Sequence, residues 1–159
     1  MSVSRRLLLV LLLVIAAPFA RADELAGVVV SVADGDTLRV LVEAREVVVR
    51  LHQIDAPERG QPFGGRSRQS LAELALKKAA RVETSGHDRY GRTVGTVYVD
   101  GLDVNAEQVR RGMAWAYRRY VQNPHLVELE QEARAAGRGL WVDAQPVEPW
   151  VWRQLQHQP

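Results

Sequence analysis

Residues 25–57 read LAGVVVSVADGDTLRVLVEAREVVVRLHQIDAP, and this stretch decides the predicted fold. Its valine-rich runs are interrupted by two turn-like segments, Asp-Gly-Asp at 34–36 and Glu-Ala-Arg at 43–45. Apolar runs bounded by such turn residues are typical of β-hairpins. The stretch therefore predicts a three-stranded meander, which stops at Pro57 because proline cannot donate a hydrogen bond to a ladder. The predicted strands cover 25–32, 37–42 and 46–54.

The chain after the meander contains both helical and strand-like patterns. Leu71, Leu74 and Ala75 have helical spacing, Asp103 can cap a following helix, and Pro124 can open another. These signals predict helices over 67–78, 104–112 and 125–136, and strands over 80–84 and 93–99. Prolines at 146 and 149 favour an extended tail.

Five short strands and three helices without alternating βαβ units indicate an α+β fold. A helix between the third and fourth strands is the arrangement of a five-stranded OB-type Greek-key β-barrel. We expect one such domain over 23–145, followed by an extended C-terminal tail over 146–159. The 159 residues, 47% of them hydrophobic and 25% charged, suit a single globular domain. The absence of cysteine excludes a disulfide scaffold, a zinc knuckle and a thiol enzyme.

The first 22 residues have the pattern of a secretory signal peptide. Arg5 and Arg6 precede an apolar run over 7–17, and Ala20-Arg21-Ala22 is a small-x-small cleavage site. The apolar run is shorter than the ~20 residues that a membrane span needs. We therefore expect export to the periplasm or the extracellular medium after cleavage near Ala22, with no membrane attachment of the mature chain.

Cleavage would change the charge balance of the chain. The whole chain has 21 Lys and Arg against 19 Asp and Glu, and residues 1–22 contain three of the arginines and no acid. The remaining chain would be close to neutral, which does not indicate a generally basic nucleic-acid binder. A site for a polyanion must then come from local clusters of basic side chains.

Four carboxylates stand at predicted strand ends or in the adjoining loops: Asp34, Asp36, Asp55 and Glu58. They converge if the meander brings its first turn beside the end of its third strand. Hard divalent cations such as calcium prefer oxygen ligands of this kind. The alternative is that 34–36 is only a turn, because Asp-Gly is common turn chemistry.

Two arginines have placements that suggest an anion site. Arg50 lies within an apolar strand, where an unpaired charge would be costly, and Arg92 follows a turn glycine at a strand start. Arginine can bind a phosphate through two parallel hydrogen bonds. Two arginines that face carboxylates across a cation can stabilise a pentacoordinate phosphorus while a carboxylate activates water. The alternative for each arginine is a structural salt bridge.

Together, these clusters resemble the staphylococcal nuclease family. The matching stretches are Asp34-Gly35-Asp36-Thr37, residues 50–58, Asp88-Arg89-Tyr90-Gly91-Arg92, Val104-Asn105, Gly112-Met113-Ala114-Trp115 and Gly139-Leu140-Trp141. The match spans about residues 27–141, and the order and spacing of the motifs are more specific than any one of them.

The resemblance implies an OB-type barrel with three helices and a calcium-dependent phosphodiesterase. Such an enzyme hydrolyses DNA and RNA and leaves 3′-phosphate ends. The resemblance also implies that Asp36, Asp55 and the backbone carbonyl of Ala56 bind one Ca²⁺ ion, supported by Asp34. Other divalent cations are compatible with these ligands. No stable protein partner is implied, so we expect a monomer.

The same resemblance implies roles for the catalytic residues Arg50, Glu58 and Arg92. Glu58 would act as the general base or orient the attacking water. Arg50 and Arg92 would bind the phosphate, and Arg92 would also assist the leaving group.

For substrate binding, Tyr90 corresponds to a tyrosine that contacts a substrate phosphate. Tyr117 and Tyr120 compete for the position of a second such tyrosine. The alternative for each is an aromatic ring that packs beside the barrel.

Two other classes of function remain open from the sequence. One is a non-catalytic nucleic-acid-binding OB-fold module, and the other is an exported structural or interaction domain. A binding module does not need the complete catalytic set. That set, Asp36, Arg50, Asp55, Glu58 and Arg92, is present here, which favours the enzyme.

Overall fold

The computed structural model describes residues 23–156. The predicted signal peptide over 1–22 lies outside the described residues, as do the last three positions. No helix within 23–156 is long and apolar enough to cross a membrane.

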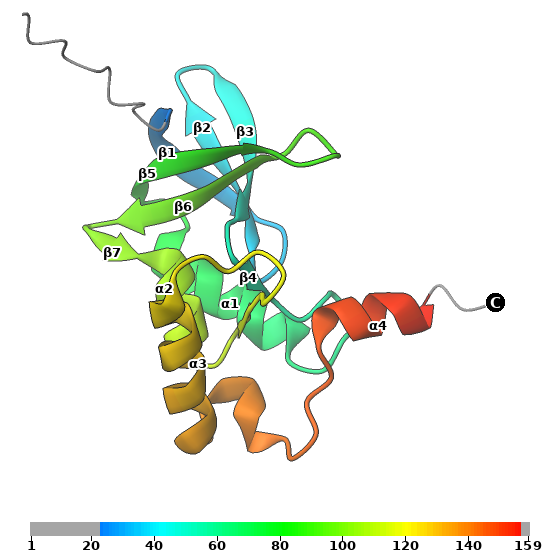
Figure 1. Cartoon of the computed structure of the whole chain (residues 1–159). Helices are drawn as coiled ribbons and strands as arrows, with labels where there is room; N and C mark the ends of the chain where they lie inside the picture. Colours follow the sequence, from blue (N-terminus) through cyan, green and yellow to red (C-terminus); the bar gives the residue numbers. More distant parts are fainter. Residues whose placement is uncertain (1–22, 157–159) are drawn as a thin grey trace, which may run out of the picture.

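A five-stranded β-barrel forms the upper half of the molecule in Figure 1. Its strands are antiparallel neighbours in the order β3-β2-β1-β5-β6, and a parallel pairing of β3 with β6 closes the barrel. The closing register places Val49 beside Thr93 and Arg50 beside Val94. The barrel strands are β1 (Glu24–Val32), β2 (Thr37–Val42), β3 (Arg45–Leu51), β5 (Ala79–His87) and β6 (Thr93–Val99).

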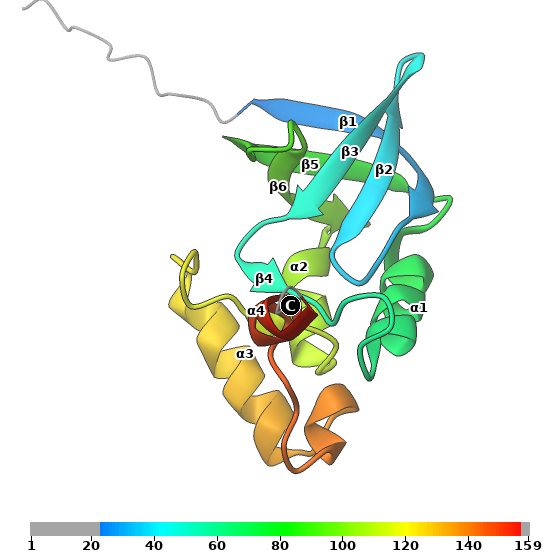
Figure 2. The same ribbon diagram turned by 90° about the vertical axis from the view of Figure 1, so that its right-hand side faces the viewer.

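The helices lie below the barrel in Figure 1, together with three two-residue strands. The short strand β4 (Ile54–Asp55) pairs with β8 (Trp115–Ala116), and β7 (Leu102–Asp103) pairs with β6. Figure 2 looks along the last helix, which lies beside β4. The helices are α1 (Gly64–Ala75), α2 (Val104–Arg110), α3 (Pro124–Ala135), the 3₁₀ turn η1 (Gly139–Val142) and α4 (Pro149–Gln156).

Two hydrophobic clusters stabilise this arrangement. The larger fills the barrel with valines that are fully buried because alternate residues of a strand face the same side. The smaller lies among α3, η1 and β8 and is built on Trp115, Leu140 and Trp141, with Phe63 and Trp150 packed against it. The second cluster therefore ties the beginning of α4 to the main body of the protein.

The structure confirms the predicted α+β fold with its five-stranded OB-type barrel. The two strands over 37–42 and 93–99 have the predicted bounds, and Asp103 caps α2 by accepting a hydrogen bond from the Ala106 N–H. Helix α1 begins at Gly64, three residues earlier than expected.

The expected extended tail over 146–159 is wrong for Pro149–Gln156, which form a fourth helix. Pro149 suggested extended chain, but a proline is also tolerated in the first turn of a helix, where its missing N–H has no helical partner. Pro149 therefore marks the start of α4 and not the absence of a helix.

The buried side chain of Asn105 links β6 to the end of β3. Its Oδ1 accepts a hydrogen bond from the Val97 N–H at 3.1 Å, and its Nδ2 donates to the carbonyls of His52 at 3.0 Å and Gly95 at 3.1 Å. Asn105 is 2% exposed, so its partners have little access to water. This single amide supports the region where the barrel closes.

Replacing Asn105 with alanine should lower the free energy of unfolding by about 2–3 kcal/mol, because the Val97 N–H and the His52 carbonyl lose the hydrogen bonds that the buried amide makes to them. Urea denaturation would measure the loss. The exposed Gln122→Ala variant provides a control that should change stability by less than about 0.5 kcal/mol. Equal stabilities of the two variants would contradict the role given to Asn105.

Candidate active site

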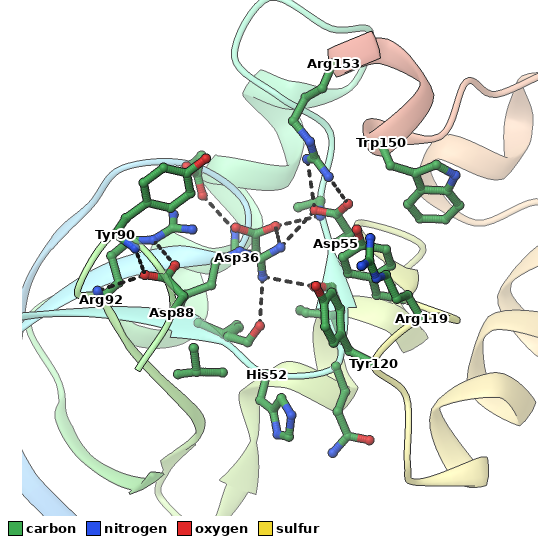
Figure 3. Close-up of a pocket in the computed structure, with 18 of the residues that line it drawn as sticks. Asp36, His52, Asp55, Asp88, Tyr90, Arg92, Arg119, Tyr120, Trp150 and Arg153 are labelled. Atoms are coloured by element: carbon green, nitrogen blue, oxygen red, sulfur yellow. Dashed lines mark hydrogen bonds and ion pairs between the residues drawn. The ribbon is translucent and has the colours of Figure 1, made fainter. Parts of the chain in front are cut away.

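A pocket of about 1080 Å³ lies where the 33–36 turn, the end of β3 and the β5–β6 loop meet the last helix. Figure 3 shows most of the side chains that line it. All ten residues named from the sequence line this pocket: Asp34, Asp36, Arg50, Asp55, Ala56, Glu58, Tyr90, Arg92, Tyr117 and Tyr120. The convergence expected from the meander is therefore present.

The 34–36 turn is held tightly against α1. Gln108 is fully buried and donates from Nε2 to the carbonyls of Gly35 at 2.8 Å and Ser67 at 3.1 Å. A Cβ atom at Gly35 would lie 1.8 Å from the Oγ of Ser67, so only glycine fits there. This close approach fixes the backbone that carries Asp34 and Asp36. The segment 34–36 is therefore a turn, as the alternative interpretation held, and it also positions two carboxylates that line the pocket.

The carboxylate of Asp36 connects the first turn to the segment after β3. Its Oδ2 accepts a hydrogen bond from the Ala56 N–H at 2.7 Å, and its Oδ1 accepts one from the Thr37 hydroxyl at 3.0 Å. Both Asp36 and Asp55 are buried. The hydrogen bond to Ala56 therefore brings the two aspartates to the same side of the pocket.

Arg50 lies between these two aspartates. Its Nη2 is 2.8 Å from Asp55 Oδ1 and 3.2 Å from Asp36 Oδ2, while its Nη1 donates to the carbonyls of Leu51 and Ile54. The arginine thus forms the salt bridges of the alternative interpretation and also lines the pocket. Its charge partly neutralises the carboxylate cluster.

Burial disfavours the charged forms of two carboxylates in this cluster, Asp34 and Asp55. Burial, and then the charge of Asp36, raise the pKa of Asp34 to about 7. Burial is also the main cause that raises the pKa of Asp55, although hydrogen bonding to Arg153 and the charge of Arg50 oppose it. A buried group of carboxylates that resists ionisation would be stabilised by a cation.

The donor chemistry of this cluster fits a hard divalent cation, because every candidate ligand is an oxygen. Within residues 23–156, however, no three acidic, histidine or cysteine side chains are arranged as a metal site. The guanidinium of Arg153 lies between two of the carboxylates. Its Nη2 is 2.7 Å from Asp55 Oδ2, and its Nη1 is 2.5 Å from Glu58 Oε1 (Figure 3).

The β5–β6 loop presents Arg92 and Tyr90 to the opposite side of the pocket. Asp88 organises the loop, because its Oδ1 accepts hydrogen bonds from the backbone of Tyr90 and Arg92, and its Oδ2 accepts one from Arg92 Nε at 2.7 Å. Burial acts to raise the pKa of Asp88, but these hydrogen bonds outweigh it and hold the pKa below its ordinary value. Asp88 remains ionised and fixes the Arg92 guanidinium.

Three aromatic side chains form one wall of the pocket. Tyr117 and Tyr120 meet edge to face with ring centroids 4.9 Å apart, and Trp150 stacks on Tyr117 at 5.2 Å with an interplanar angle of 3°. Tyr120 is half exposed. Both tyrosines that competed in the sequence therefore reach the pocket, but Trp150 covers part of Tyr117.

Sequence reasoning missed the contributions of Arg153, Trp150 and Asp88. Arg153 and Trp150 lie in the stretch expected to be extended, which does not predict that they share a face beside the pocket. Their spacing of three residues, which places them on one face of a helix, was the available signal. His52 lines the pocket as well and contacts the Ser85 hydroxyl, and burial followed by the charge of Arg50 lowers its pKa.

Comparisons with known proteins agree with this geometry. A family model described as a staphylococcal nuclease homologue matches residues 48–143. The chain is 48% identical over 141 residues to Protein ParB of Escherichia coli. This alignment covers 82% of this chain and 80% of that protein. It is 46% identical over 138 residues to a micrococcal nuclease of Shigella flexneri, in an alignment that covers 80% of this chain and 79% of that protein. It is 43% identical over 150 residues to an uncharacterized endonuclease of Escherichia coli, in an alignment that covers 94% of this chain and 97% of that protein. The chain, with its barrel and its pocket of carboxylates and arginines, belongs to the staphylococcal nuclease family.

Proposed function

We propose that this protein is an exported, calcium-dependent nuclease that hydrolyses the phosphodiester bonds of DNA and RNA and leaves 3′-phosphate ends. The observation that carries the proposal is the convergence of three carboxylates and two arginines on one pocket: Asp36, Asp55, Glu58, Arg50 and Arg92. Family membership supports a hydrolytic nuclease. Export rests on the pattern of residues 1–22.

Asp36 and Asp55 are the residues that would hold the calcium ion, together with the carbonyl of Ala56 and support from Asp34. When bound, the ion would supply positive charge beside the scissile phosphate. Arg50 already stands between Asp36 and Asp55, so it can keep these carboxylates in place and meet an incoming phosphate.

Glu58 is the carboxylate best placed to act on water. Its side chain is 36% exposed, whereas that of Asp55 is 1% exposed, so water has better access to Glu58. In the reaction, Glu58 would orient a water and take its proton as the water oxygen attacks phosphorus. The bond to the 5′ oxygen breaks, and the phosphate remains on the 3′ side.

The two arginines would stabilise the charge that develops on the phosphate oxygens. Arginine remains charged at all relevant pH values and can donate two parallel hydrogen bonds to a phosphate. Arg50 and Arg92 reach the pocket from β3 and from the β5–β6 loop. Arg92 would also stabilise the leaving oxygen.

The exposed tyrosines are suited to binding the rest of the substrate. Tyr90 is 69% exposed and has the guanidinium of Arg89 over its ring at 4.9 Å, which combines an aromatic face with a cation. Tyr120 is half exposed beside Arg119, whose guanidinium lies 5.6 Å from its ring centroid. These pairs can contact successive phosphates and bases of a single strand.

The second candidate function is a non-catalytic nucleic-acid-binding module. The arginine–tyrosine pairs would serve that function equally well. The relatives named as nucleases favour catalysis, because their sequences match this chain over most of its length.

The deciding experiment is degradation of single- and double-stranded DNA and of RNA by purified residues 23–159, with calcium, magnesium or EDTA. We expect cleavage with calcium that EDTA abolishes, and products with 3′-phosphate ends. A folded protein that binds DNA without cleaving it under any of these conditions would favour the binding module.

Replacing Arg92 with alanine, or Glu58 with glutamine, should reduce kcat by at least about 100-fold, because each change removes a group that acts in the transition state. Cleavage rates with saturating calcium and DNA would measure the loss. Arg45→Ala, at the exposed first position of β3 and outside the pocket, is the matched control. Thermal unfolding should show all three variants to be folded, and near-normal rates for the two site variants would refute the assignment.

Asp88→Ala should lower kcat about tenfold or more while leaving the barrel folded, because Arg92 loses the partner that fixes its guanidinium. Steady-state kinetics would detect the change. Asp100→Asn, in the turn after β6, is a control carboxylate outside the pocket. An Asp88→Ala variant with the turnover of this control would show that Arg92 needs no support from Asp88.

A further inference from the structure

The last helix places an arginine against Asp55, a ligand of the proposed calcium site, and against Glu58, the proposed general base. Arg153 contacts both oxygens of Asp55, with Nη2–Oδ2 at 2.7 Å and Nη1–Oδ1 at 3.3 Å, and its Nη1 also contacts Glu58 Oε1 at 2.5 Å. Arg50 contacts Asp55 from the other side. The carboxylate of Asp55 is thus shared between two guanidinium groups.

This arrangement competes with a bound cation. Arg153 contacts both oxygens of Asp55, so a divalent ion that used Asp55 as a ligand would lie close to the guanidinium, and the two positive charges would repel each other. Glu58 is affected as well, because an oxygen that accepts a hydrogen bond from Arg153 is less able to accept a proton from water.

The same helix covers one substrate-binding candidate. Trp150 stacks on Tyr117 and also meets Trp115 edge to face, with ring centroids 6.5 Å apart. One turn of α4 therefore obstructs the aromatic wall and the carboxylates together, since Trp150 and Arg153 are three residues apart on a helix.

The two ends of α4 are held in different ways. The beginning is anchored by the packing of Trp150 and by a hydrogen bond of 2.6 Å from Gln61 Nε2 to the carbonyl of Val147. Toward the other end, Arg153 is 38% exposed in its side chain and Leu155 is 53% exposed. Ion pairs, which a competing ion can replace, hold the second half in place.

We propose that α4 is an autoinhibitory element: the Arg153 guanidinium, held by Asp55 and Glu58, competes with the cation for Asp55 and must be displaced when the cation binds. The proposal rests on the calcium site given under the proposed function. Cation binding and release of the Arg153 side chain are then linked, so each favours the other to the same extent. The resting protein has a closed site, and a high calcium concentration opens it.

The linkage predicts that removal of the Arg153 charge strengthens calcium binding. The apparent dissociation constant equals the intrinsic one divided by the fraction of molecules with an open site. If about one molecule in ten is open, Arg153→Gln should bind calcium about tenfold more tightly. Trp150→Ala should also increase affinity, because it weakens the anchor of the helix.

Isothermal titration of residues 23–159 with calcium tests the proposal without relying on turnover. The matched control is Arg138→Gln, which removes an arginine outside the pocket. We expect tighter binding by Arg153→Gln and unchanged binding by the control. Cleavage of DNA at subsaturating calcium should rise in parallel for Arg153→Gln.

Fluorescence provides a second readout of helix release. Calcium should change the tryptophan emission of the unsubstituted protein as Trp150 leaves Tyr117, and Trp150→Phe should lose most of this change. A calcium-dependent change that persists in Trp150→Phe would contradict movement of the helix.

The failure of this inference can be told apart from the failure of the proposed function. If the unsubstituted protein binds calcium and cleaves DNA, and Arg153→Gln binds calcium no more tightly, α4 is not autoinhibitory but the nuclease stands. If neither protein binds calcium or cleaves DNA, the calcium site itself is refuted, and the proposed inhibition with it.

Discussion

The hydrogen bond from the Ala56 N–H to the carboxylate of Asp36 is the constraint on which the site depends. It joins residues 20 positions apart and brings the first turn of the meander to the segment that follows β3. Together with the Arg50 guanidinium, which contacts both carboxylates, this hydrogen bond holds Asp36 and Asp55 on one face of the pocket. Gln108 and Gly35 also stabilise the position of Asp36, because they fix how closely the 34–36 turn approaches α1. The charged groups then arrange themselves around a rigid backbone, which is what a precise ion site requires.

Much of the fold and most of the site could be predicted because their signals are local. Valine-rich runs and Asp-Gly turns define the strands, and the alternation along β6 leaves alternate side chains buried. The carboxylates and arginines of the candidate site lie in three short segments at strand ends, so correctly predicted strands were enough to bring them together. Arg50 shows the limit of this reasoning, because its salt bridges and its place in the pocket are compatible, whereas the sequence presented them as alternatives.

What could not be predicted depends on partners far apart in the sequence. Arg153 contacts the carboxylate of Asp55, which lies 98 positions earlier in the chain. A local sequence pattern does not predict a contact over that separation. Trp150 likewise finds Tyr117 and Trp115 only because the second hydrophobic cluster is already formed. Helix α4 was not predicted because it begins at a proline, Pro149. The sequence alone does not distinguish a proline in the first turn of a helix from one in an extended segment. The choice between Tyr117 and Tyr120 stayed open for a similar reason, as both rings reach the pocket.

The parallel pairing that closes the barrel has a consequence for how the molecule is made. It joins Val49 to Thr93 and so requires the ordering of more than forty intervening residues before the contact can form. Such non-local pairings form slowly compared with hairpins. Arg50 and Arg92 stand at this seam, which means that they come together only as the barrel closes. A growing or unfolded chain therefore contains every residue of the candidate site but does not yet have the pocket that brings Arg50 and Arg92 together.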